Sequence, residues 1–334
     1  MSRIESVDIF RFLAIAAVIV IHTHYLNTPN PDITSIAEDQ LPRFAVPFFF
    51  AISGYFWGLK IRNADSPLQA SIPMAKRILF LFVAWSAIYL FPLKHVPDIA
   101  KPILMIKDVY WNFVELAAYP VTLIMEGTKV HLWFLAGLLC SITICSTLVR
   151  YNRINTLVAL SVLLYAVGLL AKAYSLTPLG FHTAFNTRDG PFFGTIFFAS
   201  GYILSGLKPD ETWLAKGLMI MGFGFVMHFT ELYLLWRYYG QSPLRQDYVI
   251  GTYFMGIGAA TAALSNHRLV KFELPGKIGQ LTLGIYAIHF AFVDLLWQSF
   301  KGLPWELFFL AVLFLSVSTA WLLGRSRMTR RLVA

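Results

Sequence analysis

The first long apolar stretch of the chain carries ionisable side chains, which are costly in a lipid-facing helix. Arg11 and His22 are eleven residues apart, which is about three helical turns, so both should lie on one helix face about 16 Å apart. Asp8 precedes Arg11 by three residues and can pair with it. An imidazole at this depth can serve as a general base, or it can hydrogen-bond another helix and stabilise the bundle. Spacing alone leaves both interpretations of His22 open.

Five further polar side chains lie within apolar stretches. Ser53 is followed by glycine, a pair that lets another helix approach closely and that helix packing explains without any chemistry. Tyr286 and His289 are three residues apart and share a helix face. His228 and Glu231 have the same spacing, so the carboxylate could fix the tautomer of the imidazole or offset its burial cost. Taken singly, both pairs are more simply explained as structural.

Basic and aromatic residues mark the ends of two other stretches. Four cations follow the second stretch: Lys60, Arg62, Lys76 and Arg77. Such a cluster sets topology and contacts lipid head groups, but Arg and Lys would equally suit the phosphates of an anionic cofactor. His131 begins the fourth stretch, where it could titrate near neutral pH or be solvated. Trp133 is most simply an anchor at the membrane interface.

The composition shows which elements must position these residues. The chain has 334 residues, of which 57% are hydrophobic and 13% are charged, about half the usual charged share for a soluble domain. We therefore expect one integral membrane domain over residues 1–334, with any chemistry placed among its helices. About ten spanning helices would fit, so the predicted fold is an all-α polytopic bundle. The apolar stretches are Phe10–Tyr25, Phe44–Leu59, Ile78–Leu93, Leu132–Val149, Leu157–Ala173, Phe192–Leu207, Leu218–Trp236, Val249–Leu264, Ile278–Trp297 and Trp305–Leu323.

The distribution of Lys and Arg predicts the orientation. With ten spans, 16 of these residues lie on the side of the termini and 10 on the other side, so both termini should be cytosolic. The net charge of +9 is then explained by topology, because there are no long basic runs that would indicate nucleic acid. Lys94–Val130 becomes the longest external loop, in which Val109–Leu123 could form an amphipathic surface helix.

Four ordered motifs resemble acyltransferase family 3, a family of integral membrane O-acyltransferases. They are Arg-x10-His at Arg11 to His22 with its upstream acidic residue, Phe-Phe-x-x-Ser-Gly-Tyr ending at Tyr55, His-Leu-Trp-Phe from His131, and Tyr-x-x-His ending at His289. The likeness extends over nearly the whole chain. The length and the His-Leu-Trp-Phe quartet look most like the branch that O-acetylates bacterial surface sugars.

This resemblance implies a donor, an acceptor and a site. The donor would be acyl-CoA, usually acetyl-CoA, arriving from the cytosol, and the acceptor would be a sugar hydroxyl, lipid-linked or free. No metal is implied, and the expected location is the bacterial inner membrane, in contact with lipids. The catalytic candidates are His22, Arg11, Asp8, Tyr286, His289 and Ser53; the donor-binding candidates are Arg77, Lys76, Arg62 and Lys60; the acceptor-binding candidates are His131, Trp133, Glu231 and His228.

Two points in this assignment stay open. The family often carries Arg-x-x-Arg where Arg77 lies, but Phe80 stands in place of the second arginine, so Lys76 or Arg62 would have to compensate. The oxyanion could be stabilised by Tyr286, by Ser53 or by a backbone N–H.

Two functions of other classes compete with the enzyme. A proton-coupled carrier or a flippase for lipid-linked sugars would also use intramembrane histidines and Glu231. The sequence shows no two-half repeat and no paired broken helices of the kind that many carriers have. A non-catalytic membrane scaffold accounts least well for the order of the motifs.

Overall fold

The computed structural model describes residues 4–24, 33–91, 93, 102–244, 246–265 and 273–333, and within them the only regular elements are helices. The predicted all-α membrane bundle is confirmed, because each of the ten apolar stretches overlaps one helix. These helices are α1 (Glu5–His24), α3 (Ala45–Ile61), α4 (Pro67–Ile88), α7 (Trp133–Arg150), α8 (Ile154–Ala171), α9 (Pro191–Leu204), α10 (Thr212–Tyr239), α11 (Ile250–Leu264), α13 (Thr282–Phe300) and α14 (Trp305–Arg325).

Short helices connect them: α2 (Ile33–Gln40), η1 (Leu41–Phe44), α5 (Pro102–Ala118), α6 (Pro120–Glu126), η3 (Val130–Leu132), α12 (Glu273–Gly279) and η4 (Arg330–Leu332). Eight segments of the described chain are long and apolar enough to cross a membrane. The other two apolar helices, α9 and α11, have 14 and 15 residues. They are therefore shorter than the full-length spans that the sequence led us to expect.

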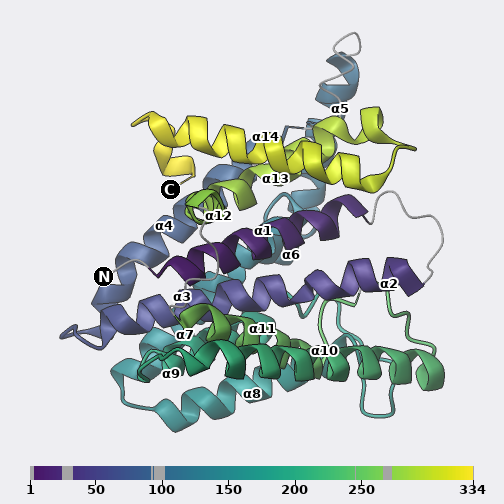
Figure 1. Cartoon of the computed structure of the whole chain (residues 1–334). Helices are drawn as coiled ribbons and strands as arrows, with labels where there is room; N and C mark the ends of the chain where they lie inside the picture. Colours follow the sequence, from purple (N-terminus) through teal and green to yellow (C-terminus); the bar gives the residue numbers. More distant parts are fainter. Residues whose placement is uncertain are drawn as a thin grey trace.

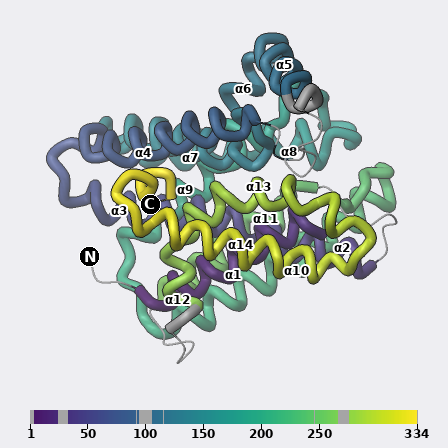
Figure 2. The backbone as a smooth tube through the Cα atoms, turned by 90° about the horizontal axis from the view of Figure 1, so that it is seen from above, coloured from purple at the N-terminus to yellow at the C-terminus, as the bar shows by residue number. Residues whose placement is uncertain are grey.

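Helix α1 lies at the centre of the bundle and contacts α3, α11, α12, α13 and α14. In Figure 1, α13 and α14 lie on one side of α1, while α3 and then α8 to α11 lie on the other. Figure 2 shows α4 running beside α7 along one flank. The two ends of the chain lie at the same end of the bundle, as an even number of crossings requires. Helices α1 and α13, which carry His22 and His289, are thus next to each other.

Close approach of α3 and α9 depends on glycine. A Cβ atom at Gly54 would collide with the carbonyl oxygen of Phe198, and one at Gly201 would collide with that of Ala51. The two backbones therefore touch where a larger side chain would force them apart. This confirms the packing interpretation of the Ser-Gly pair in the second apolar stretch.

The two short helices begin late because the segments before them are irregular. Thr187 precedes α9, and its hydroxyl donates to the carbonyl oxygen of Gly168 at 2.9 Å. Val249 precedes α11, and its carbonyl oxygen accepts from the Tyr165 hydroxyl at 2.7 Å. Irregular backbone at membrane depth needs such partners, and it is found where it lines a polar cavity. Both irregular segments therefore point to a polar region at this end of the bundle.

The predicted surface helix at Val109–Leu123 differs from what is observed. The chain forms α5 and α6, which meet at Tyr119, because Pro120 begins a new helix and lacks the N–H needed to continue the first. Helix α5 projects away from the bundle in both views. Lys94, at the start of the predicted loop, lies outside the described residues.

Candidate active site

Two cavities open between α1, α3, α7 and α13. The first has a volume of about 600 Å³ and is lined by Arg11, Lys60 and Arg77 among others; we call it the basic cavity. The second has a volume of about 470 Å³ and is lined by His22 and Trp133 among others; we call it the His22 cavity. Arg11 and His22 therefore both face the interior of the bundle, but they face different cavities.

The basic cavity combines cations with aromatic side chains. The Arg11 guanidinium pairs with the Asp8 carboxylate at 3.1 Å, and it lies 5.3 Å from the centre of the Phe56 ring. Lys60 and Arg77 reach the same space from α3 and α4, and Ser53 lines it as well. This cavity can therefore bind a negatively charged group.

Two predicted members of this cluster lie elsewhere. The Arg62 side chain donates to the Ser205 hydroxyl at 3.0 Å and to the Tyr202 carbonyl oxygen at 3.1 Å, and it stacks on the Tyr202 ring. Lys76 is exposed, and it is not among the residues that line the basic cavity. Neither is in position to replace the second arginine that Phe80 displaces. Arg11 and Lys60 are the cations that accompany Arg77.

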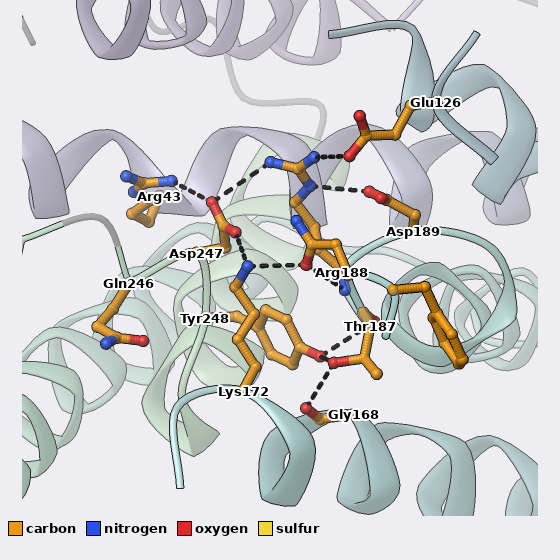
Figure 3. A network of polar contacts seen from close by, with 12 residues as sticks. Arg43, Glu126, Gly168, Lys172, Thr187, Arg188, Asp189, Gln246, Asp247 and Tyr248 are labelled. Carbon is orange, nitrogen blue, oxygen red and sulfur yellow. Dashed lines mark hydrogen bonds and ion pairs between the residues drawn. The ribbon is translucent and has the colours of Figure 1, made fainter. Parts of the chain in front are cut away.

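The His22 cavity is bordered by an ion network, which Figure 3 shows. Arg43 pairs with Asp39 at 2.8 Å and with Asp247 at 3.0 Å. Asp247 also pairs with Lys172 at 2.5 Å, and its distance to the Arg188 guanidinium is 3.7 Å. One carboxylate is thus shared by three cations from η1, from the end of α8 and from the loop before α9.

Arg188 continues the network on its other side. It pairs with Asp189 at 2.9 Å and with Glu126 at 3.1 Å, and its guanidinium carbon lies 4.8 Å from the centre of the Trp133 ring. Trp133 is buried under this contact. It is therefore an interior residue of the cavity and not the interface anchor that its position suggested.

The network shifts the pKa of the groups that lie outside the spanning helices. Burial alone would raise the pKa of Asp247, but Arg188, Lys172 and Arg43 together hold it below its usual range. Burial opposes the charge of Arg188, yet the carboxylates of Asp247, Asp189 and Glu126 raise its pKa. For Asp189, burial outweighs the attraction of Arg188, and with a hydrogen bond to Glu126 it raises the pKa to about 8.

A wall of aromatic and imidazole rings lies between the two cavities. The His22 and His289 ring centres are 5.3 Å apart, and the His289 and His131 ring centres are 5.1 Å apart. His131 stacks on Phe290 at 5.0 Å and lies 5.5 Å from Tyr286. Tyr286 lines the basic cavity, while Phe290 lines the His22 cavity. The wall therefore connects the two cavities through adjoining rings.

Two sequence-based expectations change at this wall. His131 is 1% exposed, so it is not solvated at a mouth of the bundle, because η3 turns it inward between α4 and α13. The Tyr286 hydroxyl donates to the backbone carbonyl oxygen of His131, so it is not free to stabilise an oxyanion. His22 is partly buried and remains open to its cavity.

The pair predicted on the seventh stretch is not brought to either cavity. His228 is buried, with Nδ1 3.0 Å from the Thr252 hydroxyl and Nε2 2.9 Å from the Gln40 amide oxygen. The Glu231 carboxylate accepts from the backbone N–H groups of Ile250 and Gly251 at 3.1 and 2.6 Å. Both residues therefore join α10 to neighbouring elements, and none of these bonds joins His228 to Glu231.

Sequence reasoning missed the cations and carboxylates of the His22 cavity. Arg43, Arg188 and Asp247 occur in polar segments between apolar stretches, where they look like ordinary loop residues. The one available signal was that most Lys and Arg on that side have acidic neighbours in the sequence. Among the described residues, no three His, Cys, Asp or Glu side chains are placed to share a metal ion.

Comparisons with known proteins agree with this architecture. Residues 4–325 match the acyltransferase 3 family, described as an acyltransferase domain. The chain is 26% identical over 248 residues to an amino-acid racemase of Enterococcus faecalis, covering 68% of this chain and 33% of that protein. It is 26% identical over 215 residues to a serine/alanine racemase of Enterococcus gallinarum, covering 60% of this chain and 29% of that protein.

The chain thus spans about a third of the length of these curated relatives. No solved structure matches it. The family match covers α1 to α14, including both cavities and the wall between them. The chain belongs to the acyltransferase 3 family, and its apolar helices are those of a multi-pass membrane protein.

Proposed function

We propose that the protein transfers an acetyl or other short acyl group from cytosolic acyl-CoA to a hydroxyl of a cell-surface or lipid-linked sugar, in the inner membrane of a bacterium. The observation that carries this proposal is the placement of a cationic cavity and a histidine cavity on two sides of one thin wall. A bound donor and a bound acceptor would meet at His22.

The charges of the basic cavity support a polyanionic donor. Arg11, Lys60 and Arg77 line it, and no carboxylate is among its lining residues in the described part of the chain. Asp8, which pairs with Arg11, is not among the lining residues. The phosphates of CoA would bind Arg77 and Lys60 through charge-assisted hydrogen bonds.

The charges of the His22 cavity support an uncharged polyol. Two cations, Arg43 and Arg188, face two carboxylates, Asp39 and Asp247, so these four groups balance. Such a set offers hydrogen-bond donors and acceptors but has no net attraction for an ion. A neutral sugar would satisfy both kinds of group, whereas an anionic acceptor would have to displace a carboxylate.

His22 would act as the general base. Its imidazole takes the proton of the sugar hydroxyl while the oxygen attacks the thioester carbonyl, and the carbon–sulfur bond breaks as the ester forms. The proton then passes to the CoA thiolate, so the products are the O-acyl sugar and free CoA. General-base assistance of this kind contributes about two to four decades in rate.

A carrier for lipid-linked sugars remains the competing function. The observation in its favour is that α9 and α11 are short and begin beside a buried ion network, as helices at transport sites often do. Against it, the Glu231 carboxylate is occupied by backbone N–H groups and by the Tyr174 hydroxyl. These bonds account for Glu231 as a residue that joins α10 to α11.

The decisive experiment uses the purified protein in lipid nanodiscs with acetyl-CoA labelled in the acetyl group. An alkyl glucoside serves as the first sugar acceptor, and mass spectrometry identifies the product. We expect an O-acetyl sugar with the wild-type protein, and a loss of at least a hundredfold with His22→Ala. His182→Ala is the matched control, because this histidine is exposed in a loop.

Full activity of His22→Ala would refute the catalytic role. Absence of acylated product with acetyl-, propionyl- and succinyl-CoA across a panel of neutral sugars would refute the transferase. Movement of a labelled lipid-linked sugar between the leaflets without acylation would establish the carrier instead.

A further inference from the structure

The wall between the cavities contains buried nitrogen atoms that no protein atom satisfies. Neither ring nitrogen of His131 has a hydrogen-bond partner among the described residues, and the same is true of His289 Nε2. The two side chains are 1% and 0% exposed. Buried polar groups nearly always have a hydrogen-bond partner, so three unpaired nitrogens at one place indicate a partner that the described polypeptide does not supply.

The hydrogen-bonding roles of the two imidazoles can be deduced. His289 Nδ1 lies 2.6 Å from the backbone carbonyl oxygen of Tyr286. A carbonyl oxygen only accepts, so Nδ1 carries the hydrogen and Nε2 of the neutral ring is an acceptor. His131 makes no bond that selects a tautomer, so it can present an N–H donor. The wall thus offers one donor on His131 and one acceptor on His289, with ring centres 5.1 Å apart.

The chemistry of this pair selects an uncharged partner. Nearby side chains are aromatic: Tyr89, Tyr286 and Phe290 contact the His131 ring. No three ligating side chains of the described chain can share a metal ion there, and the charge of Lys129, 4.8 Å from the centre of the Phe290 ring, is offset by its ion pair with Asp294. A neutral group with one carbonyl and one N–H would satisfy both imidazoles.

We propose that His131 and His289 bind the uncharged end of the acyl donor, with His131 donating to the thioester carbonyl oxygen. His289 Nε2 accepts from the amide N–H that follows two methylene groups beyond the sulfur. This inference rests on the proposed function, because it places the thioester between the basic cavity and His22. As the sugar oxygen attacks, negative charge develops on the oxygen bound to His131, so the same contact strengthens in the transition state.

This assignment replaces the donors that the sequence suggested. The Tyr286 hydroxyl donates to the His131 carbonyl oxygen. Ser53, on α3, lines the basic cavity, whereas His22 lines the other cavity. His131 instead adjoins both Tyr286 and His289, and His289 adjoins His22. His131 is thus the buried hydrogen-bond donor at the position where the two substrates would meet.

Binding provides a test that does not depend on turnover. Acetyl-CoA is compared with S-ethyl-CoA, a thioether in which a methylene group replaces the carbonyl, by calorimetric titration of the full-length protein in nanodiscs. We expect the wild-type protein to prefer acetyl-CoA by about threefold to tenfold, the value of one hydrogen bond. His131→Leu should lose this preference while binding of CoA itself stays within threefold.

Matched variants separate a hydrogen bond from packing. His131→Gln supplies an N–H in a similar volume and should restore the preference, whereas His131→Phe fills the space without a donor and should not. His228→Leu removes another buried histidine, whose nitrogens have partners away from both cavities, and should leave the preference unchanged. In acyl transfer, His131→Leu should raise KM for acetyl-CoA by the same threefold to tenfold, and it should lower kcat much more, by about 10²–10³.

The possible failures are distinguishable. A wild-type protein that binds CoA without preferring acetyl-CoA refutes the role of His131 and leaves the proposed function standing. Equal activity of His131→Phe and wild type does the same. A wild-type protein that does not bind CoA refutes the proposed function and this inference together.

Discussion

Loss of Asp247 should destabilise the protein more than loss of any ordinary surface charge. Its side chain is 15% exposed and pairs with Arg43 at 3.0 Å and Lys172 at 2.5 Å, with Arg188 at 3.7 Å. Asp247→Ala leaves three partly buried cations around an uncharged methyl group. Removal of one partner of a buried ion pair costs about 3–5 kcal/mol. Because Arg43 and Arg188 keep other carboxylates, we expect a value near 3 kcal/mol.

The measurement is a denaturant titration of the protein in detergent micelles, followed by tryptophan fluorescence. Asp65→Ala is the control, because Asp65 is exposed on the α3–α4 turn, and it should cost less than about 0.5 kcal/mol. Adding Lys172→Met to Asp247→Ala removes one of the stranded cations, so the double variant should recover about 1 kcal/mol. A cost below about 1 kcal/mol for Asp247→Ala would show that solvent already screens the network, and the argument from burial would fail.

Three further predictions address the donor site, the pH dependence and the packing. Arg77→Gln should raise KM for acyl-CoA about tenfold, the value of one charge-assisted hydrogen bond. Arg62→Gln should change KM less than twofold, because Arg62 does not line the basic cavity. Equal effects of the two variants on KM would contradict the assignment. The pKa of Asp189 rises from 3.8 to about 8 on folding, so the folded state binds this proton more tightly than the unfolded state does. The contribution of Asp189 to the free energy of unfolding is therefore greatest below pH 4 and is lost as the pH rises toward 8. Thermal melts of Asp189→Asn should lack this decline, and an unchanged pH profile would disprove the burial argument. Gly54→Ala should lower the melting temperature by several degrees, because the added Cβ meets the α9 backbone. Gly222→Ala, with open space around it, should leave the melting temperature unchanged or raise it. An unchanged melting temperature for Gly54→Ala would show that α3 and α9 can separate.

The fold was largely predictable because a segment in lipid must satisfy its own backbone hydrogen bonds, as a helix does. Every long apolar stretch in the sequence became a helix, and the Ser-Gly pair at Gly54 marked a close helix contact. Helix ends were less predictable. Helices α9 and α11 begin only after polar segments whose hydrogen bonds come from distant residues such as Tyr165 and Glu231. No local pattern reveals such partners.

The candidate site was predictable where one helix carries it and unpredictable where several elements assemble it. Arg11 and His22 share α1, so their spacing predicted a common helix face, and both line cavities inside the bundle. Arg43, Arg188 and Asp247 come from three separate parts of the chain, and their charges make sense only together. The inward position of His131 depends on the η3 turn before α7, which hydropathy does not register.

The ion network also explains how a histidine could work beside two arginines. In the proposed reaction His22 would become a cation when it takes the proton of the acceptor, and Arg43 and Arg188 line the same cavity. Alone, these guanidinium groups would oppose that proton transfer. Asp39 and Asp247 balance them at 2.8 and 3.0 Å from Arg43, so the cavity stays close to neutral while the imidazolium forms. Asp247, which joins the segments before α9 and α11, would therefore also favour the base that we propose there.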